Sequence, residues 1–458
     1  MKAKVFLTAA GILLLTAVFL NSCDTTTPVT PIDDDPDVTE NVIEVNKFIQ
    51  ENMDIYYLWN EEMPDLDYTK QPDPFDFFDT LLYKPTDRWS YITDDYEALA
   101  QSYSGVEESM GHSYILYKYS NSDGLFGIIQ FVYPGSPAAE AGLKRGDLFT
   151  AIDEVDLTLD NYISLLDQDS YLLTVAELQG NTVVPVKDVN LTAKVITENP
   201  ILYYDTLNVD GTRIGYLVYK NFLENYNDSL SEAFSWLKSM GINEMILDLR
   251  YNNGGSITAL RYLASILAPV QQINNADVLI KDQYNAILTQ YYNNKGISNE
   301  TRFTFVTPNL DLSRLYVLTG HNSASASEAL ITGLDPYMDV TTLGDTTRGK
   351  YTGAYVIPEE DLNWAIQPIV FKYSNSVGYT DFPGGLYPDY VEDDDLFHQL
   401  GDRNEGLLAS AIEKITGVQA SVAAKSARIK LNVHPVKAFD NNQPREAIPL
   451  LKEKPELE

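Results

Sequence analysis

The sequence predicts an α/β core that follows a β-rich module and a small helical cap. Three observations indicate this order. Residues 213–334 alternate short apolar runs with helical patterns, residues 105–196 carry short strand-like runs between turns, and residues 41–104 place apolar side chains at helical spacing. The chain has 458 residues, which is too long for one ordinary domain.

The helical cap is predicted over residues 41–104. Val45, Ile49 and Met53 recur at helical spacing, and a second apolar cluster follows at residues 75–82. The β-rich module is predicted over residues 105–196. Its runs at residues 114–119 and 127–133 are rich in Ile, Val, Phe and Tyr, as strands are.

The α/β core is predicted over residues 197–419. Strands are expected at residues 213–219 and 245–250, and helices at 230–240 and 257–267. A further apolar run at residues 315–319 is followed by small residues and a helical pattern from 328 to 334, which continues the alternation. Residues 420–458 are rich in Lys, Pro and Glu and weakly periodic, so we expect a loosely packed tail there.

The composition describes an acidic globular protein. Hydrophobic residues make up 44% and aromatic residues 11%, which suits packed cores rather than disorder. A formal net charge of −34 would repel a phosphate backbone, so nucleic-acid binding is not expected. We interpret the acidity as a solvated surface rather than as a site for a cationic partner.

The first residues resemble an export signal. Lys2 and Lys4 precede an uncharged apolar run at residues 5–20, which predicts a signal peptide over residues 1–22. An uncleaved membrane anchor is the weaker interpretation, because the run is shorter than the roughly 20 residues of a spanning helix.

Residues 20–23 (Leu-Asn-Ser-Cys) resemble the lipobox of bacterial lipoproteins. The resemblance implies lipidation of Cys23, a tether over residues 23–40, and a membrane-anchored protein of a bacterial cell envelope, periplasmic or on the outer surface. The alternative is an incidental cysteine in a discarded leader. Cys23 is the only cysteine, so disulfides, thiol catalysis and cysteine-ligated metals are excluded from the exported body.

A candidate nucleophile follows the predicted strand at residues 315–319. Three serines alternate there, Ser323, Ser325 and Ser327, and a helical pattern comes next. A serine at a sharp strand-to-helix turn is exposed at its tip, and nearby helix amides can stabilise an oxyanion. The alternative is that these serines only cap the helix. Physical reasoning alone does not choose among the three.

Residues 323–328 (Ser-Ala-Ser-Ala-Ser-Glu) resemble the signature of the tail-specific, or C-terminal processing, serine peptidases. The resemblance implies that Ser325 is the nucleophile and that Lys350 is its general base, and residues 340–344 and 348–350 match the same pattern. It further implies a ClpP/crotonase-like core and an acyl-enzyme route.

A lysine base must lose its proton, although its reference pKa is about 10.4. Burial that lowers the pKa by about three units costs roughly 4 kcal/mol, so we expect a dry pocket. A solvated surface lysine is the alternative interpretation of Lys350.

Residues 251–255 (Tyr-Asn-Asn-Gly-Gly) follow a predicted strand and are similar to the family's double-glycine turn. The resemblance implies that the amide of Gly254 or Gly255, together with that of Ala326, forms the oxyanion hole. The choice between the two glycines stays open.

The sequence departs from the family at one position. The family often has a glutamine four residues after the lysine, where it orients the amine, whereas this chain has Ala354. Gln367, in the next predicted strand, is a possible substitute. The departure leaves the efficiency of catalysis in question.

Residues 124–129 (Gly-Leu-Phe-Gly-Ile-Ile), 134–143 and 146–147 resemble a PDZ domain. Such a domain binds a peptide's terminal carboxylate through loop amides while the peptide adds as a strand to a sheet edge. A turn without a ligand is the alternative. The resemblance implies that the peptide-binding residues are Leu125, Phe126, Gly127 and Ile128.

The sequence therefore predicts a serine endopeptidase that acts on protein or peptide substrates recognised near their C-termini. The alternative is a weak or inactive peptide-binding lipoprotein of the same fold, and a hydrolase of small esters or sugars is a weaker third. We expect neither a metal nor a cofactor, since the sequence holds no HExxH motif and no EF-hand loop. The four histidines also lack an acidic partner at a telling spacing.

Overall fold

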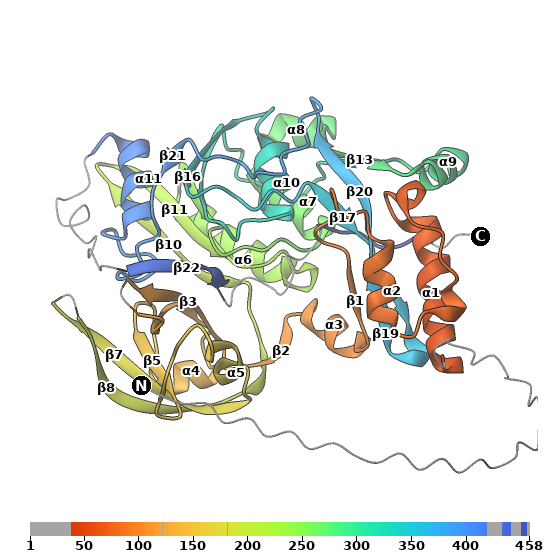
Figure 1. Cartoon of the computed structure of the whole chain (residues 1–458). Helices are drawn as coiled ribbons and strands as arrows, with labels where there is room; N and C mark the ends of the chain where they lie inside the picture. The colour runs from red at the N-terminus through yellow and green to blue at the C-terminus, as the bar shows by residue number, and fades with distance from the viewer. Residues whose placement is uncertain (1–37, 121, 181, 419–432, 441–449, 456–458) are drawn as a thin grey trace, which may run out of the picture. The chain divides into compact units, whose positions relative to one another are not determined.

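The structure is a computed structural model that describes residues 38–120, 122–180, 182–418, 433–440 and 450–455, with the backbone alone described for 433–440 (Figure 1). The predicted signal peptide, Cys23 and nearly all of the predicted tether lie outside the described residues.

The predicted helical cap contains two helices that pack against each other, α1 and α2 (Figure 1). Thr39 caps α1, and its apolar stripe, which includes Ile49 and Met53, is fully buried. Asp73 caps α2, whose first residue is Pro74, a favoured position for proline. The elements of this region are α1 (Glu40–Tyr56), η1 (Asn60–Glu62), η2 (Tyr68–Lys70), α2 (Pro74–Leu81), β1 (Tyr91–Thr93) and α3 (Tyr96–Ser102).

The β-rich module is a sheet in which the strands are ordered β22-β3-β4-β5-β7-β8, with β6 paired to β5. Its core includes Leu116, Phe149 and Leu173, all fully buried. The elements are β2 (Val106–Ser109), β3 (His112–Tyr119), β4 (Leu125–Val132), α4 (Pro137–Glu140), β5 (Leu148–Ile152), β6 (Val155–Asp156), α5 (Tyr162–Leu166), β7 (Ser170–Gln179), β8 (Thr182–Thr192) and β9 (Lys194–Thr197).

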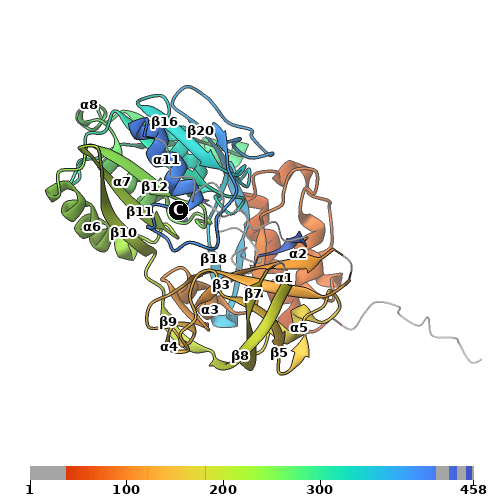
Figure 2. The same cartoon turned by 90° about the vertical axis from the view of Figure 1, so that its left-hand side faces the viewer.

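The α/β core is built on a sheet ordered β10-β11-β12-β15-β16-β21, in which β11, β12, β15 and β16 run parallel. Both faces of this sheet are covered. Leu217 points from β11 to the face packed by α6, α7 and α10, while Tyr216 points to the face packed by α11. Figure 2 shows α6, α7 and α11 beside strands β10, β11 and β12 of this sheet. Parallel strands buried on both faces read as continuous apolar runs, which is why the sequence shows them so clearly.

The predicted strand–helix alternation is present in this sheet. Its elements are β10 (Ile201–Val209), β11 (Thr212–Tyr219), η3 (Glu224–Tyr226), α6 (Asn227–Ser239), β12 (Glu244–Asp248), α7 (Ile257–Leu267), α8 (Val270–Asn275), β15 (Arg314–Thr319), α10 (Ala326–Leu334), β16 (Asp339–Gly344), β21 (Tyr390–Val391) and α11 (Gly406–Thr416).

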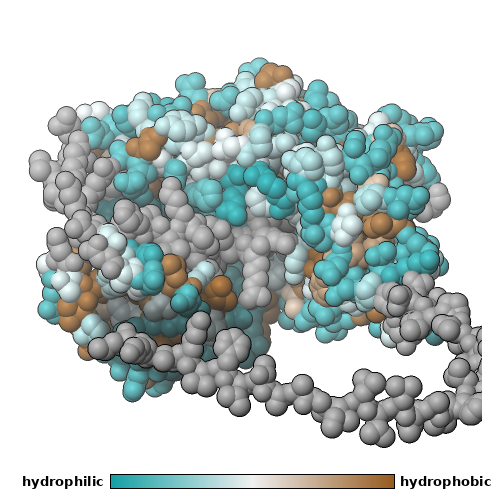
Figure 3. All heavy atoms as spheres, in the orientation of Figure 1, coloured by the Kyte–Doolittle hydropathy of each residue, from teal (hydrophilic) through white to brown (hydrophobic). Residues whose placement is uncertain are grey.

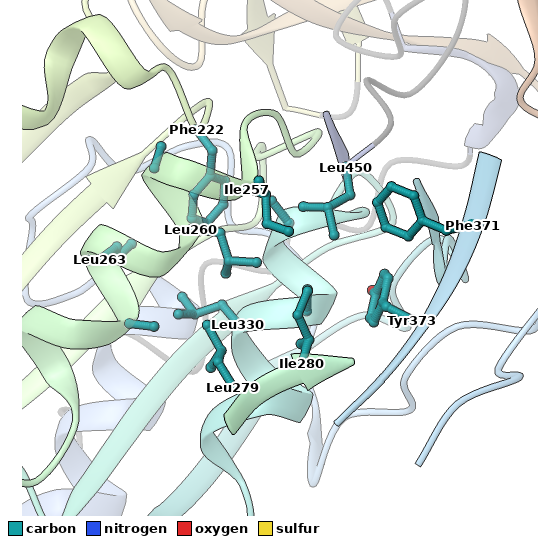
Figure 4. Close-up of a cluster of buried hydrophobic side chains, with 14 of the residues drawn as sticks. Phe222, Ile257, Leu260, Leu263, Leu279, Ile280, Leu330, Phe371, Tyr373 and Leu450 are labelled. Atoms are coloured by element: carbon teal, nitrogen blue, oxygen red, sulfur yellow. The ribbon is translucent and has the colours of Figure 1, made fainter. Parts of the chain in front are cut away.

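A second sheet, ordered β14-β13-β20-β17-β23, packs on the other side of α7 and α10. Figure 4 shows the apolar layer between them, where Leu260 and Leu330 face Ile280 and Phe371. A small sheet, β1-β19-β18, joins the helical cap to this region. The elements are β13 (Val278–Tyr284), α9 (Ala286–Lys295), β14 (Glu300–Arg302), β17 (Thr352–Ala354), β18 (Ile357–Glu359), η4 (Glu360–Leu362), β19 (Trp364–Gln367) and β20 (Ile369–Asn375).

The predicted loose tail is wrong for the parts of residues 420–458 that the structure describes. β22 (Val433–Asp440) pairs antiparallel with β3, and β23 (Leu450–Leu451) pairs parallel with β17. Weak periodicity hid these strands because each is stabilised by pairing with a distant sheet edge, which a local pattern does not encode.

The visible surface is mostly hydrophilic, with apolar residues in small groups (Figure 3). The high negative charge of the chain agrees with this surface. Within the described part of the chain, no helix combines the length and the apolar character that crossing a membrane requires.

Candidate active site

Ser325 lies at the turn between β15 and α10, directly before the first residue of the helix. Its backbone has φ 57° and ψ −108°, a conformation that costs a non-glycine residue roughly 1–3 kcal/mol. The sharp strand-to-helix turn predicted from the sequence is therefore present. The side chain, however, is fully buried in this structure rather than exposed at the tip.

The structure distinguishes the three alternating serines that the sequence could not separate. Ser323 Oγ donates to the carbonyl of Leu249 (2.8 Å), and Ser327 Oγ donates to the carbonyl of Asn252 (3.2 Å). Ser325 Oγ is buried and has no hydrogen-bond partner among the described residues. Two serines therefore have structural roles, and Ser325 alone of the three keeps an uncommitted hydroxyl.

One carboxylate organises the turn. Glu328, fully buried in the first turn of α10, accepts the backbone N–H of Ser325 (2.9 Å) and that of Lys350 (2.8 Å) on Oε2. Its Oε1 accepts the Thr347 hydroxyl (2.5 Å) and the Gly349 N–H (2.7 Å). Burial raises the pKa of Glu328, and these four hydrogen bonds oppose that shift. The sequence offered Glu328 as part of a signature but not as the link between Ser325 and Lys350.

Lys350 is fully buried, as a base of this kind requires. Its Nζ lies 4.9 Å from the ring centroid of Trp89, which the segment between α2 and β1 brings to the site. The Tyr373 hydroxyl lies 3.2 Å from the carbonyl oxygens of both Ser325 and Lys350. Sequence reasoning missed Trp89 and Tyr373, because neither belongs to a motif.

The backbones of Ser325 and Lys350 are thus held side by side. No hydrogen bond joins Ser325 Oγ to Lys350 Nζ here, since Oγ has no partner within the described part of the chain. Catalytic hydrogen bonds are often long or misaligned in unliganded enzymes and tighten with substrate.

The double-glycine turn lies beside Ser325, as expected. The Ala324 N–H donates to the carbonyl of Asn252 (3.0 Å), which ties the two turns together. The Gly254 N–H is occupied by Asn252 Oδ1 (2.9 Å). Gly255 has φ 137°, and a Cβ there would lie 2.3 Å from the Phe222 carbonyl oxygen, so the position requires glycine. The occupied amide of Gly254 favours Gly255, with Ala326, as the oxyanion-binding pair.

The two residues discussed for the missing glutamine have other surroundings. Ala354 is fully buried in β17, and Gln367 Nε2 donates to the Tyr103 hydroxyl (2.6 Å). Among the described residues, no hydrogen bond joins Gln367 to Lys350. Orientation of the amine by Gln367 stays a prediction without a contact to support it.

No group of three or more His, Cys, Asp or Glu residues within the described ranges is arranged to hold a metal ion. His398 Nδ1 pairs with Asp395 Oδ2 (2.7 Å), a partnership that sequence spacing did not reveal. Asp395 also accepts the N–H of Gly406 at the start of α11, so this pair anchors a helix.

Three family models match the chain. The model of peptidase family S41 matches residues 213–391, that of the S41 N-terminal domain matches residues 44–91, and a PDZ domain model matches residues 128–177. The chain thus contains a peptidase family S41 domain, an S41 N-terminal domain and a PDZ domain.

Individual relatives agree with the family models. The chain is 28% identical over 301 residues to a carboxyl-terminal-processing protease of Synechocystis, covering 64% of this chain and 66% of that protein. It is 26% identical over 280 residues to a chloroplastic C-terminal processing peptidase of Tetradesmus obliquus, covering 57% and 56%. The chain thus spans less than two thirds of the length of these curated relatives.

A solved structure of a Bacteroides fragilis protein described as an S41 protease superposes with a TM-score of 0.68. The two chains are 28% identical, and the match covers 81% of this chain and 97% of the other. The S41 fold with its PDZ domain and N-terminal region is thereby confirmed.

The four residues predicted to bind peptide lie inside the PDZ sheet. Leu125, Phe126, Gly127 and Ile128 form the start of β4, which pairs with β3 on one side and with β5 at Gly127 and Ile128 on the other. The Leu125 N–H already donates to the Leu157 carbonyl (2.8 Å). These residues form an interior strand rather than the expected carboxylate-binding loop, and β3 carries the pairing edge, which β22 occupies.

A buried charge network connects the PDZ domain to the S41 domain. Arg145 donates to Asp394 Oδ1 (2.7 Å) and to the Tyr251 hydroxyl, one residue before Asn252. Arg250 donates to the same Asp394 oxygen (2.7 Å) and to Glu405. Burial opposes the ionisation of Asp394, but the two guanidinium groups outweigh it and lower its pKa to about 2.

Proposed function

We propose that this S41 peptidase is a serine endopeptidase in which Ser325 is the nucleophile and Lys350 the general base. The observation that carries the proposal is the Glu328 carboxylate, which binds the amides of both residues and so fixes a buried lysine next to an uncommitted buried hydroxyl. Lysines are rarely fully buried, and buried ionisable groups cluster at functional sites, so a buried lysine held near a strained serine supports this chemistry.

The reaction follows from these positions. The neutral Lys350 amine takes the proton of Ser325 Oγ while Oγ attacks the scissile carbonyl carbon. The oxyanion that forms is stabilised by the amides of Gly255 and Ala326. The lysine then gives its proton to the leaving amine, which leaves an acyl-enzyme, and a water molecule activated by Lys350 hydrolyses the ester and regenerates the serine.

We further propose protein or peptide substrates that are recognised near their C-termini. Supporting this are the PDZ domain match and the names of the relatives, which are carboxyl-terminal-processing proteases. The β3 edge of the PDZ sheet already carries one added strand, β22, in this structure. In strand addition, backbone hydrogen bonds give affinity and side-chain pockets give specificity.

Membrane anchorage is a separate proposal. Residues 20–23 and the apolar run before them support an exported lipoprotein that is acylated at Cys23 and located in a bacterial cell envelope. Labelling with a radioactive fatty acid, compared between the parent and Cys23→Ala, tests it. Equal labelling of the two proteins would contradict the assignment.

The competing function is an inactive peptide-binding lipoprotein. Two observations favour it: Ala354 replaces the family's glutamine, and Ser325 Oγ makes no hydrogen bond to Lys350. This alternative predicts binding of C-terminal peptides without cleavage, even over long incubations.

A fluorophosphonate probe separates the two functions. We expect the parent to be labelled and to cleave peptides, Ser325→Ala to lose both activities, and Lys350→Met to lose them while staying folded. Ser327→Ala is the matched control, because its hydroxyl only bonds to the Asn252 carbonyl, and it should still be labelled. Labelling of Ser325→Ala at the parent rate would refute the proposal.

A further inference from the structure

A segment of the chain itself occupies the edge of the second sheet beside the active site. In β23, Leu450 lies opposite Gly353 and Leu451 opposite Ala354, both in β17, which begins two residues after Lys350. On the other side the Leu451 N–H donates to the carbonyl of Gly255 (3.0 Å). The segment therefore lies between the proposed oxyanion turn and the strand that follows the proposed base.

The backbone contacts of this segment are those of an added strand. Besides the pairing with β17, the Lys452 N–H donates to the carbonyl of Ala354 (3.3 Å). Leu450 is fully buried and packs near Ile257 and Phe371 (Figure 4). Any extended segment could make the backbone bonds, so sequence selectivity has to come from side-chain pockets.

Lys452 fills such a pocket. Its Nζ donates to Asp282 Oδ2 (2.7 Å) and to the Tyr284 hydroxyl (2.9 Å). The ammonium also lies 5.6 Å from the ring centroid of Tyr284 and 6.0 Å from that of Phe371. A carboxylate, a hydroxyl and two aromatic rings together recognise a cation.

The buried carboxylate of Asp282 requires a cation beside it. Its side chain is fully buried within β13, and burial raises its pKa, whereas the Lys452 ammonium lowers it. Its second oxygen, Oδ1, is buried and has no hydrogen-bond partner among the described residues. A lysine satisfies one oxygen of this carboxylate, whereas a guanidinium presents two parallel N–H donors and could satisfy both.

We propose that the β17 edge, the Gly255 carbonyl and the Asp282 pocket form a substrate subsite for an extended peptide segment with a basic side chain, which residues 450–452 occupy in this structure. The proposal rests on the proposed peptidase function, for which it names the substrate class. The peptide adds as a strand parallel to β17, and its Arg or Lys takes the position of Lys452.

A structural ion pair between Lys452 and Asp282 would make the same contacts as a substrate subsite. Measurements of peptide binding distinguish the two explanations. The protein is the full chain with Ser325→Ala, which prevents turnover, and Leu450→Asp, which places a charge in the apolar layer and displaces the chain's own segment. The probe is a fluorescent peptide, Leu-Leu-Lys-Glu-Lys, that copies residues 450–454. Its third residue is varied to arginine or to norleucine, and anisotropy reports the Kd.

We expect the arginine peptide to bind at least as tightly as the lysine peptide, and the norleucine peptide to bind about 10- to 100-fold more weakly. Asp282→Asn in the same background should remove most of this difference. A peptide with norleucine at the fifth position is the matched control, because Lys454 lies near Tyr56 rather than Asp282. Equal binding of the lysine and norleucine peptides, or a preference that survives Asp282→Asn, would overturn the proposal.

A second measurement covers the case in which the Leu450→Asp chain does not fold. Lys452→Met keeps the length of the side chain but removes the charge. This variant should increase the hydrogen-exchange rates of the amides of residues 352–354. It should also strengthen binding of the lysine peptide by about tenfold. Unchanged exchange together with unchanged affinity would refute the subsite. Neither experiment uses cleavage, so a failed peptidase assignment would not be confused with a failed subsite.

Discussion

Replacing Glu328 by glutamine tests the claim that one carboxylate positions both proposed catalytic residues. The carboxylate accepts four hydrogen bonds, two on each oxygen. Glutamine has one acceptor oxygen, and its NH₂ group must face the donors on the other side. Whichever way the amide is oriented, at least one buried backbone N–H loses its acceptor.

The magnitude follows from those bonds. Each hydrogen bond to a charged group contributes about 1.5–3 kcal/mol, and a buried donor left without a partner costs about 1–3 kcal/mol. An amide is easier to bury than a carboxylate, which offsets part of the loss, so we expect Glu328→Gln to destabilise the protein by about 2–4 kcal/mol. A displacement of about 1 Å at the reacting atoms lowers the rate on the order of 100-fold.

The assay measures kcat and KM on a peptide substrate, with thermal unfolding recorded in parallel. Because Glu328 does not touch substrate, kcat should fall while KM changes little. The control is Glu360→Gln, an exposed carboxylate in η4, which should leave both constants unchanged. A Glu328→Gln enzyme with parental kcat would refute the positioning role, even if its melting temperature fell.

Two further predictions concern groups outside the signature motifs. Trp89→Ala should lower kcat/KM about tenfold, because it exposes the Lys350 amine to water. Trp89→Phe should keep most of the activity. If both variants were as active as the parent, this role of Trp89 would be contradicted. His112 is kept neutral by burial, which lowers its pKa from 6.5 to about 4. The unfolded chain takes up a proton near pH 6.5 and the folded chain does not, so stability should fall as the pH drops below 6.5. The loss is about 2 kcal/mol by pH 5, and His112→Leu should remove that slope in urea titrations at pH 7 and pH 5.

The sequence predicted the parts of the fold that local patterns encode. The strands of the core stand out because they are buried on both faces, and α1 and α2 because each has a capping residue and an apolar stripe. β22 and β23 were missed because each pairs with a strand far away in the sequence. The interior position of residues 125–128 was missed because a glycine-containing run reads alike as a loop or as a strand.

The candidate site shows the same division. The motifs pointed to Ser325, Lys350 and the Gly254-Gly255 turn, and the fold brings all of them together. Trp89 lies about 260 residues before Lys350 in the sequence, and Tyr373 lies in a strand without a recognisable motif. Only the folded chain shows that both contact Lys350. The choice of Gly255 over Gly254 depends on one hydrogen bond from Asn252, which spacing does not contain.

The two sequence interpretations of the serine turn, helix cap and nucleophile, are compatible in the folded protein. The hydroxyl oxygen of a capping serine normally accepts a hydrogen bond from a backbone N–H in the first turn of the helix. Here the orphan amide of Ser325 is satisfied by the carboxylate of Glu328, one half of a capping box, and the strained turn is fixed by the bonds of Ser323 and Ser327. Because other groups cap the turn and hold it in place, the hydroxyl of Ser325 is left for chemistry.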